Sequence, residues 1–449
     1  MIFRRQSCLL PHNEPASRKT SALNRLSFLK QHFTPAQINI YFSIACFFSP
    51  PVLGSVVSFV FNGGGLWSVL LVAVKKRRFG LDRPALAMTL AFYAYCAAVI
   101  LASLVNKSVV ADAPHMPALI TFLFFPISYS TWSITGKATL ARIIVLSSAA
   151  ACLGALILAV VQYYWLGMRA EGGAGNAIVF ATVACLAVMM CVAGALSGIE
   201  KAWKPLILAA LAGAVAIVYS GSRIIWLAML IAGIAVLLIN RRKLSGGNFI
   251  RLVLITAAIV LVIAVFGYPI ISQRADFLFS DWDALASKGD HTTALGLRVA
   301  MWHIGLGAFR EAPIFGHGIV ASHDLMHQGF QDQFGMNQGF SHFHNGFLTA
   351  LVEAGILGVV TLAAIFVVAA RNAARVLRLS TDPLERFGAT MIVVTVITYL
   401  TGGLTGILVG HDILDSVLMV FLVAGTYLAS GRQQPLPQGP ALPLPSAAG

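Results

Sequence analysis

The organisation of this chain is clearest in one stretch, which reads Gly339-Phe-Ser-His-Phe-His-Asn-Gly-Phe-Leu-Thr-Ala-Leu-Val-Glu-Ala-Gly-Ile-Leu-Gly358. It closes a polar region, roughly 272–343, that is far longer than any other gap between apolar runs. It also opens an apolar run that continues to about residue 370. His342 and His344 are therefore predicted to lie where a transmembrane helix leaves the water, beneath a large polar loop.

The composition excludes an ordinary water-soluble domain. Hydrophobic residues make up 58% of the chain and charged residues 11%, and the mean hydropathy is +0.82. A helix needs roughly 20 apolar residues to cross the hydrocarbon core of a bilayer. The sequence offers about twelve apolar runs of roughly this kind, so we expect an all-α polytopic membrane protein with about twelve transmembrane helices.

The apolar runs divide the chain into five parts. They lie approximately at 38–55, 57–74, 84–104, 117–132, 138–164, 177–197, 205–220, 223–239, 250–271, 345–370, 387–409 and 413–430. We expect a basic N-terminal tail (1–36), transmembrane helices one to nine (37–271), a large loop with amphipathic helices (272–343), transmembrane helices ten to twelve (344–430) and a Pro-rich, disordered tail (431–449).

Basic residues are segregated between the two sides of this arrangement. With twelve helices, 24 of the 31 Lys and Arg residues fall on the side of the two termini. Positive charge is enriched on the cytoplasmic side of membrane proteins, so both termini are predicted to be cytoplasmic and the large loop to face outward. The net charge of +14 then reflects topology, with membrane lipid headgroups as the partner and no role in binding nucleic acid.

Seven basic residues lie on the outer side, where orientation does not require them, and Arg223 is the most informative. It follows Ser220-Gly-Ser222 in a turn between two apolar runs. One interpretation is an arginine that extends from a helix end to the lipid headgroups. The other is an anion site, in which the planar guanidinium works with Ser220, Ser222 and the free N–H groups of a helix start.

Two further outer arginines have specific surroundings. Arg169 lies in a Gly-rich loop that ends at Asn176, and it is either simply solvated or an anion ligand. Arg298 lies in a segment with an apolar stripe at helical spacing, formed by Leu295, Val299, Trp302, Leu306 and Phe309. This helix is predicted either to lie on the membrane surface or to pack on the core of the loop. In both cases Arg298 and His303 fall near the edge of the stripe, able to face a cleft.

The histidines of the outer segment allow three interpretations. His342 or His344 is suited to act as a general base near neutral pH, or a histidine simply caps a helix end. His323 and His327 have the spacing of metal ligands on a helix, but Asp324 stands where zinc proteases carry glutamate, and the other spacings are irregular. We therefore expect no metal site.

Several of these motifs together resemble the bacterial O-antigen ligase family, within the O-antigen ligase/polymerase superfamily. The likeness covers roughly residues 160–370 and rests on the order and outward placement of its motifs. These are Arg169 to Asn176, Ser220-Gly-Ser-Arg-Ile-Ile-Trp-Leu227, Arg298 with Trp302 and Pro313-Ile-Phe-Gly-His-Gly318, and His344-Asn345 followed by Gly355-Ile-Leu-Gly358.

The resemblance implies a GT-C-type membrane glycosyltransferase of the inner membrane with a periplasmic active site. Its donor would be an undecaprenyl-pyrophosphate-linked glycan and its acceptor a sugar hydroxyl of lipid A–core oligosaccharide, with no metal and no other cofactor. It implies His344 as the general base and Arg223 and Arg298 as catalytic groups on the pyrophosphate. Arg169, His342, Asn345, Ser222 and His303 are expected to bind substrate, and His342 remains the alternative base.

Three other functions stay open at this stage. An O-antigen polymerase would use the same donor with a second lipid-linked glycan as acceptor. A protein O-oligosaccharyltransferase would transfer the glycan to a protein hydroxyl. A transporter or flippase for the lipid-linked glycan would show repeated halves and charged residues at mid-membrane, whereas here the notable polar groups gather on one face.

Overall fold

The computed structural model describes residues 34–75, 77–241 and 246–434 of the chain, without the side chains of the first part of α12 (Gly246–Lys288). Every regular element in these ranges is a helix, and ten helices are long and apolar enough to cross a membrane. They are α2 (Pro35–Leu53), α3 (Val56–Ala73), α4 (Arg83–Val105), α8 (Lys137–Val160) continued by the π-helix η2 (Val161–Trp165), α9 (Ala177–Ser197), α10 (Trp203–Ser220), α11 (Arg223–Asn240), α15 (Gly346–Leu379), α16 (Pro383–Gly403) and α17 (Asp412–Ser430). This confirms the predicted class of polytopic helical protein.

The structure thus gives ten candidate spans where the sequence predicts about twelve. The predicted run 117–132 is divided into α6 (Pro117–Leu123) and α7 (Phe125–Trp132), and neither is long enough to span a bilayer. Pro126 explains the division, because proline has no N–H for the helix ladder and its ring clashes with the preceding turn. The other run, 250–271, forms the first part of the 43-residue helix α12.

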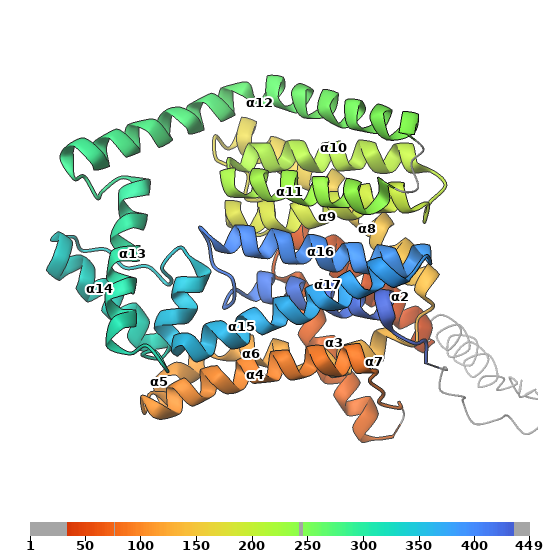
Figure 1. The fold of residues 1–449 in the computed structure, drawn as a ribbon, viewed down its shortest axis with the longest axis horizontal. Helices are drawn as coiled ribbons and strands as arrows, with labels where there is room; N and C mark the ends of the chain where they lie inside the picture. The colour runs from red at the N-terminus through yellow and green to blue at the C-terminus, as the bar shows by residue number, and fades with distance from the viewer. Residues whose placement is uncertain (1–33, 76, 242–245, 435–449) are drawn as a thin grey trace, which may run out of the picture.

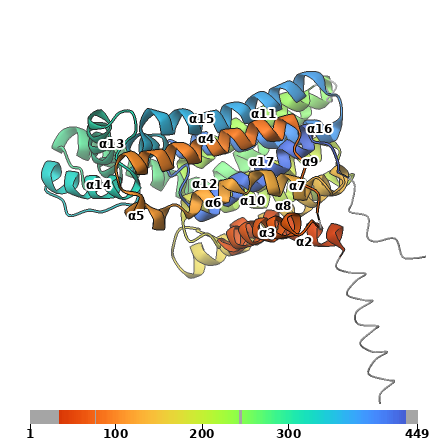
Figure 2. The same ribbon diagram turned by 90° about the horizontal axis from the view of Figure 1, so that it is seen from below.

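The spanning helices lie side by side along one direction, with α9 and α17 in the middle (Figures 1 and 2). In α9, 89% of the most apolar window is buried inside the protein, and in α17 the value is 94%. Both helices are apolar on nearly all sides, which is the pattern of a helix that contacts protein all round. By contrast, only 22% of the most apolar window of α3 and 28% of that of α11 are buried, so these two helices lie at the periphery of the bundle.

Two helices lie beyond one end of this bundle, α13 (Ala294–Glu311) and α14 (Ile319–Phe334) (Figure 1). α12 leads to them: it is 43 residues long, about 64 Å along its path at 1.5 Å per residue, and it bends along its length (Figure 1). It contains Pro269 and continues as one helix through the predicted boundary at residue 271. α2 begins and α17 ends at the opposite end of the bundle. The predicted tails fall largely outside the described residues.

The face by which α13 packs differs from the predicted stripe. Its buried residues are Ala300, Met301, Ile304 and Ala308, which form a small core with Met326 and Phe330 of α14 and with Phe343, Leu348 and Val352. Leu306, a member of the predicted stripe, is 47% exposed. Small residues explain the difference, because Gly305 allows α13 to approach Leu348 and Phe343 so closely that an added Cβ would lie 2.9 Å from each. Of the two predicted positions of this helix, the structure favours the one on the loop's own core.

A kink in α15 fixes α13 and α14 to the bundle. At Gly355 the backbone has φ 64° and ψ −162°, which interrupts the helical hydrogen bonds. The segment 313–318 occupies the gap: His317 and Gly318 donate backbone N–H groups to the carbonyls of Val352 and Glu353, and Ile356 donates to the carbonyl of Pro313. The backbone of the Pro-Ile-Phe-Gly-His-Gly motif thus occupies the kink of α15 and sets the position of α13 and α14 at this end of the bundle.

Candidate active site

The turn between α10 and α11 is built to hold Arg223 at the end of the bundle where α13 and α14 lie. Gly221, with φ 64°, makes the sharp reversal possible. The buried hydroxyls of Ser220 and Ser222 donate to backbone carbonyls of neighbouring turns, those of Ile217 (2.6 Å) and Ala177 (3.1 Å). The side chain of Ser222, predicted to bind substrate, is therefore engaged in fixing the turn.

Arg223 points from this turn to α12. Its Nη1 donates to the backbone carbonyl of Arg274 at 2.6 Å. The side chain of Arg274 returns the contact, since a Cβ on Gly221 would lie only 2.7 Å from its Nε. That Nε is buried and has no hydrogen-bond partner among the described residues. A donor left open in this way is suited to a ligand rich in acceptor oxygens.

Two more arginines complete an arginine cluster, which we define as Arg169, Arg223, Arg274 and Arg298. Nε of Arg169 donates to the carbonyl of Ser220 at 2.9 Å. Burial, then the charge of Arg274, and further the charges of Arg298 and Arg223 lower the pKa of Arg169. Burial and the charge of Arg223 likewise lower the pKa of Arg298. The four guanidiniums therefore act on one another, although they come from four separate parts of the chain.

Nothing in the described ranges neutralises this cluster by an ion pair. The three ion pairs found there join Lys137 to Glu385, Arg142 to Glu200 and His411 to Asp412. Carboxylates lie in the neighbourhood, since Glu171 raises the pKa of Arg169 and Asp281 that of Arg298, but neither offsets the lowering. Like charges that gather without a direct counterion make a site for a multiply charged anion.

Sequence reasoning placed three of these four arginines in the site and missed Arg274. A signal for it was present, because Arg274 is one of the seven basic residues on the outer side of the predicted topology. Arg274 has no motif around it, and the sequence places it at the start of the predicted loop. In the structure it lies on α12, which brings it beside the α10–α11 turn.

His342 and His344 lie next to the arginine cluster, immediately before α15. Their rings are 4.4 Å apart between centroids, and Phe340 lies edge-on to His344 at 5.8 Å. His344 has φ 46°, a left-handed conformation that costs free energy for a residue other than glycine and recurs at functional sites. Its Nδ1 is buried and has no hydrogen-bond partner among the described residues.

Both imidazoles are held in the neutral form at neutral pH. Burial, followed by the charge of His344 and then His411, lowers the pKa of His342 to about 4. Burial and the charge of Arg298 lower the pKa of His344. A neutral imidazole with an open nitrogen can accept a proton, which is the requirement for a general base.

The two histidines line a cavity of about 210 Å³, here called the histidine cavity. Asn176 at the start of α9, Tyr399 of α16 and His411 before α17 contribute to the same wall. Sequence reasoning missed His411, which follows the outer segment by some seventy residues and stands alone at the start of an apolar run. The bundle brings His411 here because α16 ends and α17 begins at the end of the bundle where α15 begins (Figure 1).

Two predicted substrate ligands have other surroundings. Asn345 is the N-cap of α15, where its side-chain oxygen accepts from the N–H groups of Phe347 and Leu348, both at 3.1 Å. His303 is exposed, lies edge-on to Phe334 at 6.3 Å and is not among the residues that line the histidine cavity. The predicted stripe placed His303 toward a cleft, and the different packing face of α13 turns it away.

The fold and site together define a polytopic helical membrane protein with an arginine cluster and two neutral imidazoles at one end of its bundle. The model of the O-antigen ligase family matches residues 207–363, from α10 to the kinked half of α15. This stretch includes Arg223, Arg274, Arg298, His342 and His344. This match over about a third of the chain confirms the predicted resemblance to the O-antigen ligase family.

A curated relative shows a shorter likeness. Over 94 residues the chain is 32% identical to an uncharacterized protein of Haemophilus influenzae, and the alignment covers 20% of this chain. It spans 24% of the relative's length, so the likeness concerns about a quarter of that protein.

Proposed function

We propose that this protein is an O-antigen ligase that transfers glycan from undecaprenyl pyrophosphate to a sugar hydroxyl of lipid A–core oligosaccharide. The observation that carries the proposal is the arginine cluster, which has no ion-pair partner among the described residues and lies beside two neutral imidazoles. A pyrophosphate leaving group needs positive charge, which the arginine cluster provides. An acceptor hydroxyl needs a proton acceptor, which a neutral imidazole provides. The match to the O-antigen ligase family over residues 207–363 supports this choice of substrates.

In the proposed reaction, the acceptor hydroxyl oxygen attacks the anomeric carbon in line with the departing pyrophosphate, so the sugar configuration inverts. The new carbon–oxygen bond forms as the bond to the pyrophosphate oxygen breaks. That oxygen gains negative charge, which Arg223 and Arg298 stabilise with the help of Arg169 and Arg274. The open nitrogen of His344 takes the acceptor proton. Each of these roles is performed by a side chain of the protein, without a metal or another cofactor.

The charge distribution supports the proposed location. The 24 basic residues that gather on the side of the termini favour a multi-pass protein of the inner membrane with cytoplasmic termini and a periplasmic site. Both substrates are lipids, and a GT-C-type arrangement would let them enter from the bilayer between the bundle and the helices α13 and α14.

Reconstitution tests the proposal. Purified protein in detergent is mixed with undecaprenyl-pyrophosphate glycan and lipid A–core in the presence of EDTA, and the lipid A–core band is followed by gel mobility. We expect a shift of that band. Lengthening of the donor glycan alone would identify a polymerase, and glycan on an added acceptor protein would identify a protein O-oligosaccharyltransferase. If no glycan is transferred to any acceptor, the enzyme proposal fails and lipid-glycan transport becomes the function to test.

Substitutions then test the roles. His344→Ala should reduce transfer about 10²–10⁴-fold, the usual contribution of a general base, and Arg223→Ala about 10²–10³-fold. Arg310→Ala is the matched control, because Arg310 is an exposed outer arginine on α13 that belongs to neither group. Full activity of the His344 and Arg223 variants would overturn the assignment.

A further inference from the structure

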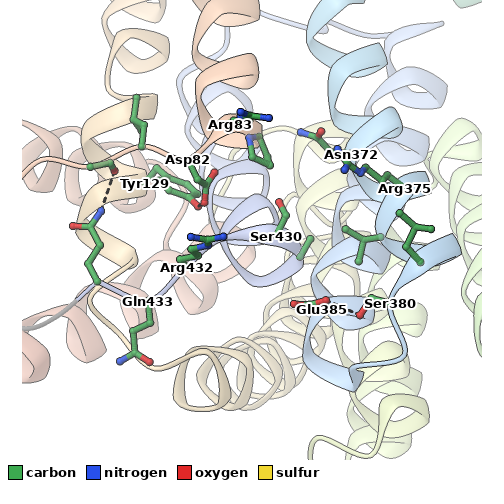
Figure 3. Close-up of a pocket in the computed structure, with 17 residues that line it drawn as sticks. Asp82, Arg83, Tyr129, Asn372, Arg375, Ser380, Glu385, Ser430, Arg432 and Gln433 are labelled. Carbon is green, nitrogen blue, oxygen red and sulfur yellow. Dashed lines mark hydrogen bonds between the residues drawn. The ribbon is translucent and has the colours of Figure 1, made fainter.

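A second cavity, of about 1070 Å³, lies at the end of the bundle opposite the arginine cluster. Its wall is formed by the first turn of α4, the last turns of α15 and α17, and the first turn of α16, with Tyr129 of α7 at one side (Figure 3). These elements belong to separate parts of the sequence, and only part of α15 overlaps the segment matched by the ligase family. We call it the basal cavity.

Three guanidiniums line the basal cavity, those of Arg83, Arg375 and Arg432. They come from α4, α15 and the residues that follow α17, and Figure 3 shows them on three sides of the same space. Among the residues that the structure describes, none of the three forms an ion pair with a carboxylate. They are therefore available to a ligand.

The two carboxylates in the wall are already used by the fold. Asp82 is the N-cap of α4, where one oxygen accepts from the N–H of Ala85, and its other oxygen accepts from the hydroxyl of Tyr129. Glu385 accepts from the hydroxyl of Ser380 at 2.6 Å and pairs with Lys137 at 3.8 Å. Neither carboxylate compensates the arginines directly.

Asn372 adds an open donor to the same wall. Its Nδ2 is buried and has no hydrogen-bond acceptor among the described residues. It lies one helical turn before Arg375 on α15, so the two side chains share one face of that helix (Figure 3). A buried amide donor without an acceptor is unfavourable unless a ligand or water supplies one.

We propose that the basal cavity binds a phosphate-bearing ligand whose phosphate oxygens accept hydrogen bonds from Arg83, Arg375, Arg432 and Asn372. Guanidinium forks match the geometry of phosphate oxygens, and the volume leaves room for an organic group attached to the phosphate. The headgroup of an anionic phospholipid and a soluble phosphate compound share this chemistry. The site is separate from the proposed transfer site and does not depend on its function.

Thermal unfolding of the purified full chain measures the binding, with tryptophan fluorescence as the signal. The protein is held in neutral-lipid nanodiscs, and the unfolding temperature is recorded against increasing phosphatidylglycerol in one series and increasing inorganic pyrophosphate in another. Ligands that bind the folded state raise this temperature. In the double variant Arg375→Gln/Arg432→Gln, half-saturation should require at least about tenfold more ligand, because charge-assisted hydrogen bonds are lost.

The matched control is Arg371→Gln/Arg378→Gln, which removes the same charge from α15. Both positions are exposed, as Arg375 and Arg432 are, but neither lines the cavity. Asn372→Leu tests the site without changing charge and should also weaken binding. A response to phosphatidylglycerol alone that the cavity variant weakens identifies a lipid headgroup. A response to pyrophosphate counts for a soluble ligand of this cavity only where the cavity variant weakens it, because pyrophosphate is also the proposed ligand of the arginine cluster. The proposal is overturned if neither ligand stabilises the protein, or if the control double variant loses as much affinity as the cavity variant.

Discussion

Arg298 and His344 are linked through the proton that His344 is proposed to accept. Burial and the charge of Arg298 both lower the pKa of His344, so protonation inactivates the base only at acidic pH. In Arg298→Gln the charge is absent and the pKa of His344 rises. The acidic limb of the pH profile of kcat/KM should then move to higher pH, in addition to a loss of rate of about 10²–10³-fold.

Arg310→Gln supplies the comparison for this prediction, because it removes a charge from the same helix at an exposed position. Its profile should superimpose on that of the unchanged protein. If the Arg298→Gln profile keeps its acidic limb at the original pH while the rate falls, Arg298 acts on the pyrophosphate alone and His344 is not the titrating base. His342→Gln distinguishes the two histidines, since the base is the one whose removal abolishes the limb.

At this scale, the sequence indicated residues whose position is unusual for their type. Arg223 was recognisable because orientation does not require an arginine in so short an outer turn, and His344 because it stands where a helix leaves the membrane. Arg274 and His411 were missed, since their neighbours along the chain carry no motif. Only the fold gives them a role: α12 brings Arg274 beside Arg223, and the start of α17 brings His411 beside the histidine cavity.

Among the elements, the kink of α15 determines where the outer helices sit, and Gly355 is the residue that permits it. A Cβ at this position would lie 2.2 Å from the carbonyl oxygen of Ile314, and φ is +64°. A φ of 64° with ψ −162° is a backbone conformation that essentially only glycine adopts. It costs another residue about 1–3 kcal/mol, and the clash adds to it. Gly355→Ala should therefore lower the unfolding temperature and disrupt activity, whereas Gly233→Ala in α11, where a Cβ meets nothing within 4 Å, should not. Equal unfolding temperatures for the two variants would contradict this account.

The start of α14 depends on a carboxylate from another element. Asp112, at the end of the short helix α5 (Val109–Asp112), accepts from the N–H of Val320 at 2.9 Å and from the hydroxyls of Ser103 and Ser108. Burial opposes its charge, but these hydrogen bonds prevail and lower the pKa of Asp112. Asp112→Ala leaves three donors open and should cost about 1–3 kcal/mol, with faster hydrogen exchange at the first turn of α14.

Asp332→Ala is the control for α14, since Asp332 is exposed near the end of the same helix. It should leave the exchange of the first turn unchanged. Protection that survives in Asp112→Ala would mean that the small core with α13 fixes α14 without the carboxylate.

Element prediction worked where one physical signal dominated. Long apolar runs predicted ten of the spanning helices, because the bilayer demands length and hydropathy whatever the packing. The structure differs from the prediction in two places, the division of the run 117–132 at Pro126 and the packing face of α13, and the reasons differ. Pro126 lies inside an apolar run and was treated as part of a span. The α13 prediction followed large residues, whereas close packing there uses Ala300, Gly305 and Ala308.

For the whole molecule, the charge asymmetry predicts which end faces the cytoplasm. The arginine cluster and histidine cavity lie at the end with few basic residues, and the basal cavity lies at the end rich in them. Cysteines at two exposed positions test this, Asn337→Cys after α14 and Gln433→Cys after α17. In cells with a permeabilised outer membrane, a membrane-impermeant maleimide should label the first and not the second.

The background of this measurement is low, because the five cysteines in the described ranges are buried, and Cys8→Ser removes the remaining one. Lysis should make Gln433→Cys reactive, which shows that its silence in cells comes from the membrane. Labelling of Gln433→Cys before lysis, with Asn337→Cys silent, would place the arginine cluster in the cytoplasm. It would then face a compartment other than the proposed one, and the ligase proposal would fail at the level of topology whatever the chemistry of its side chains.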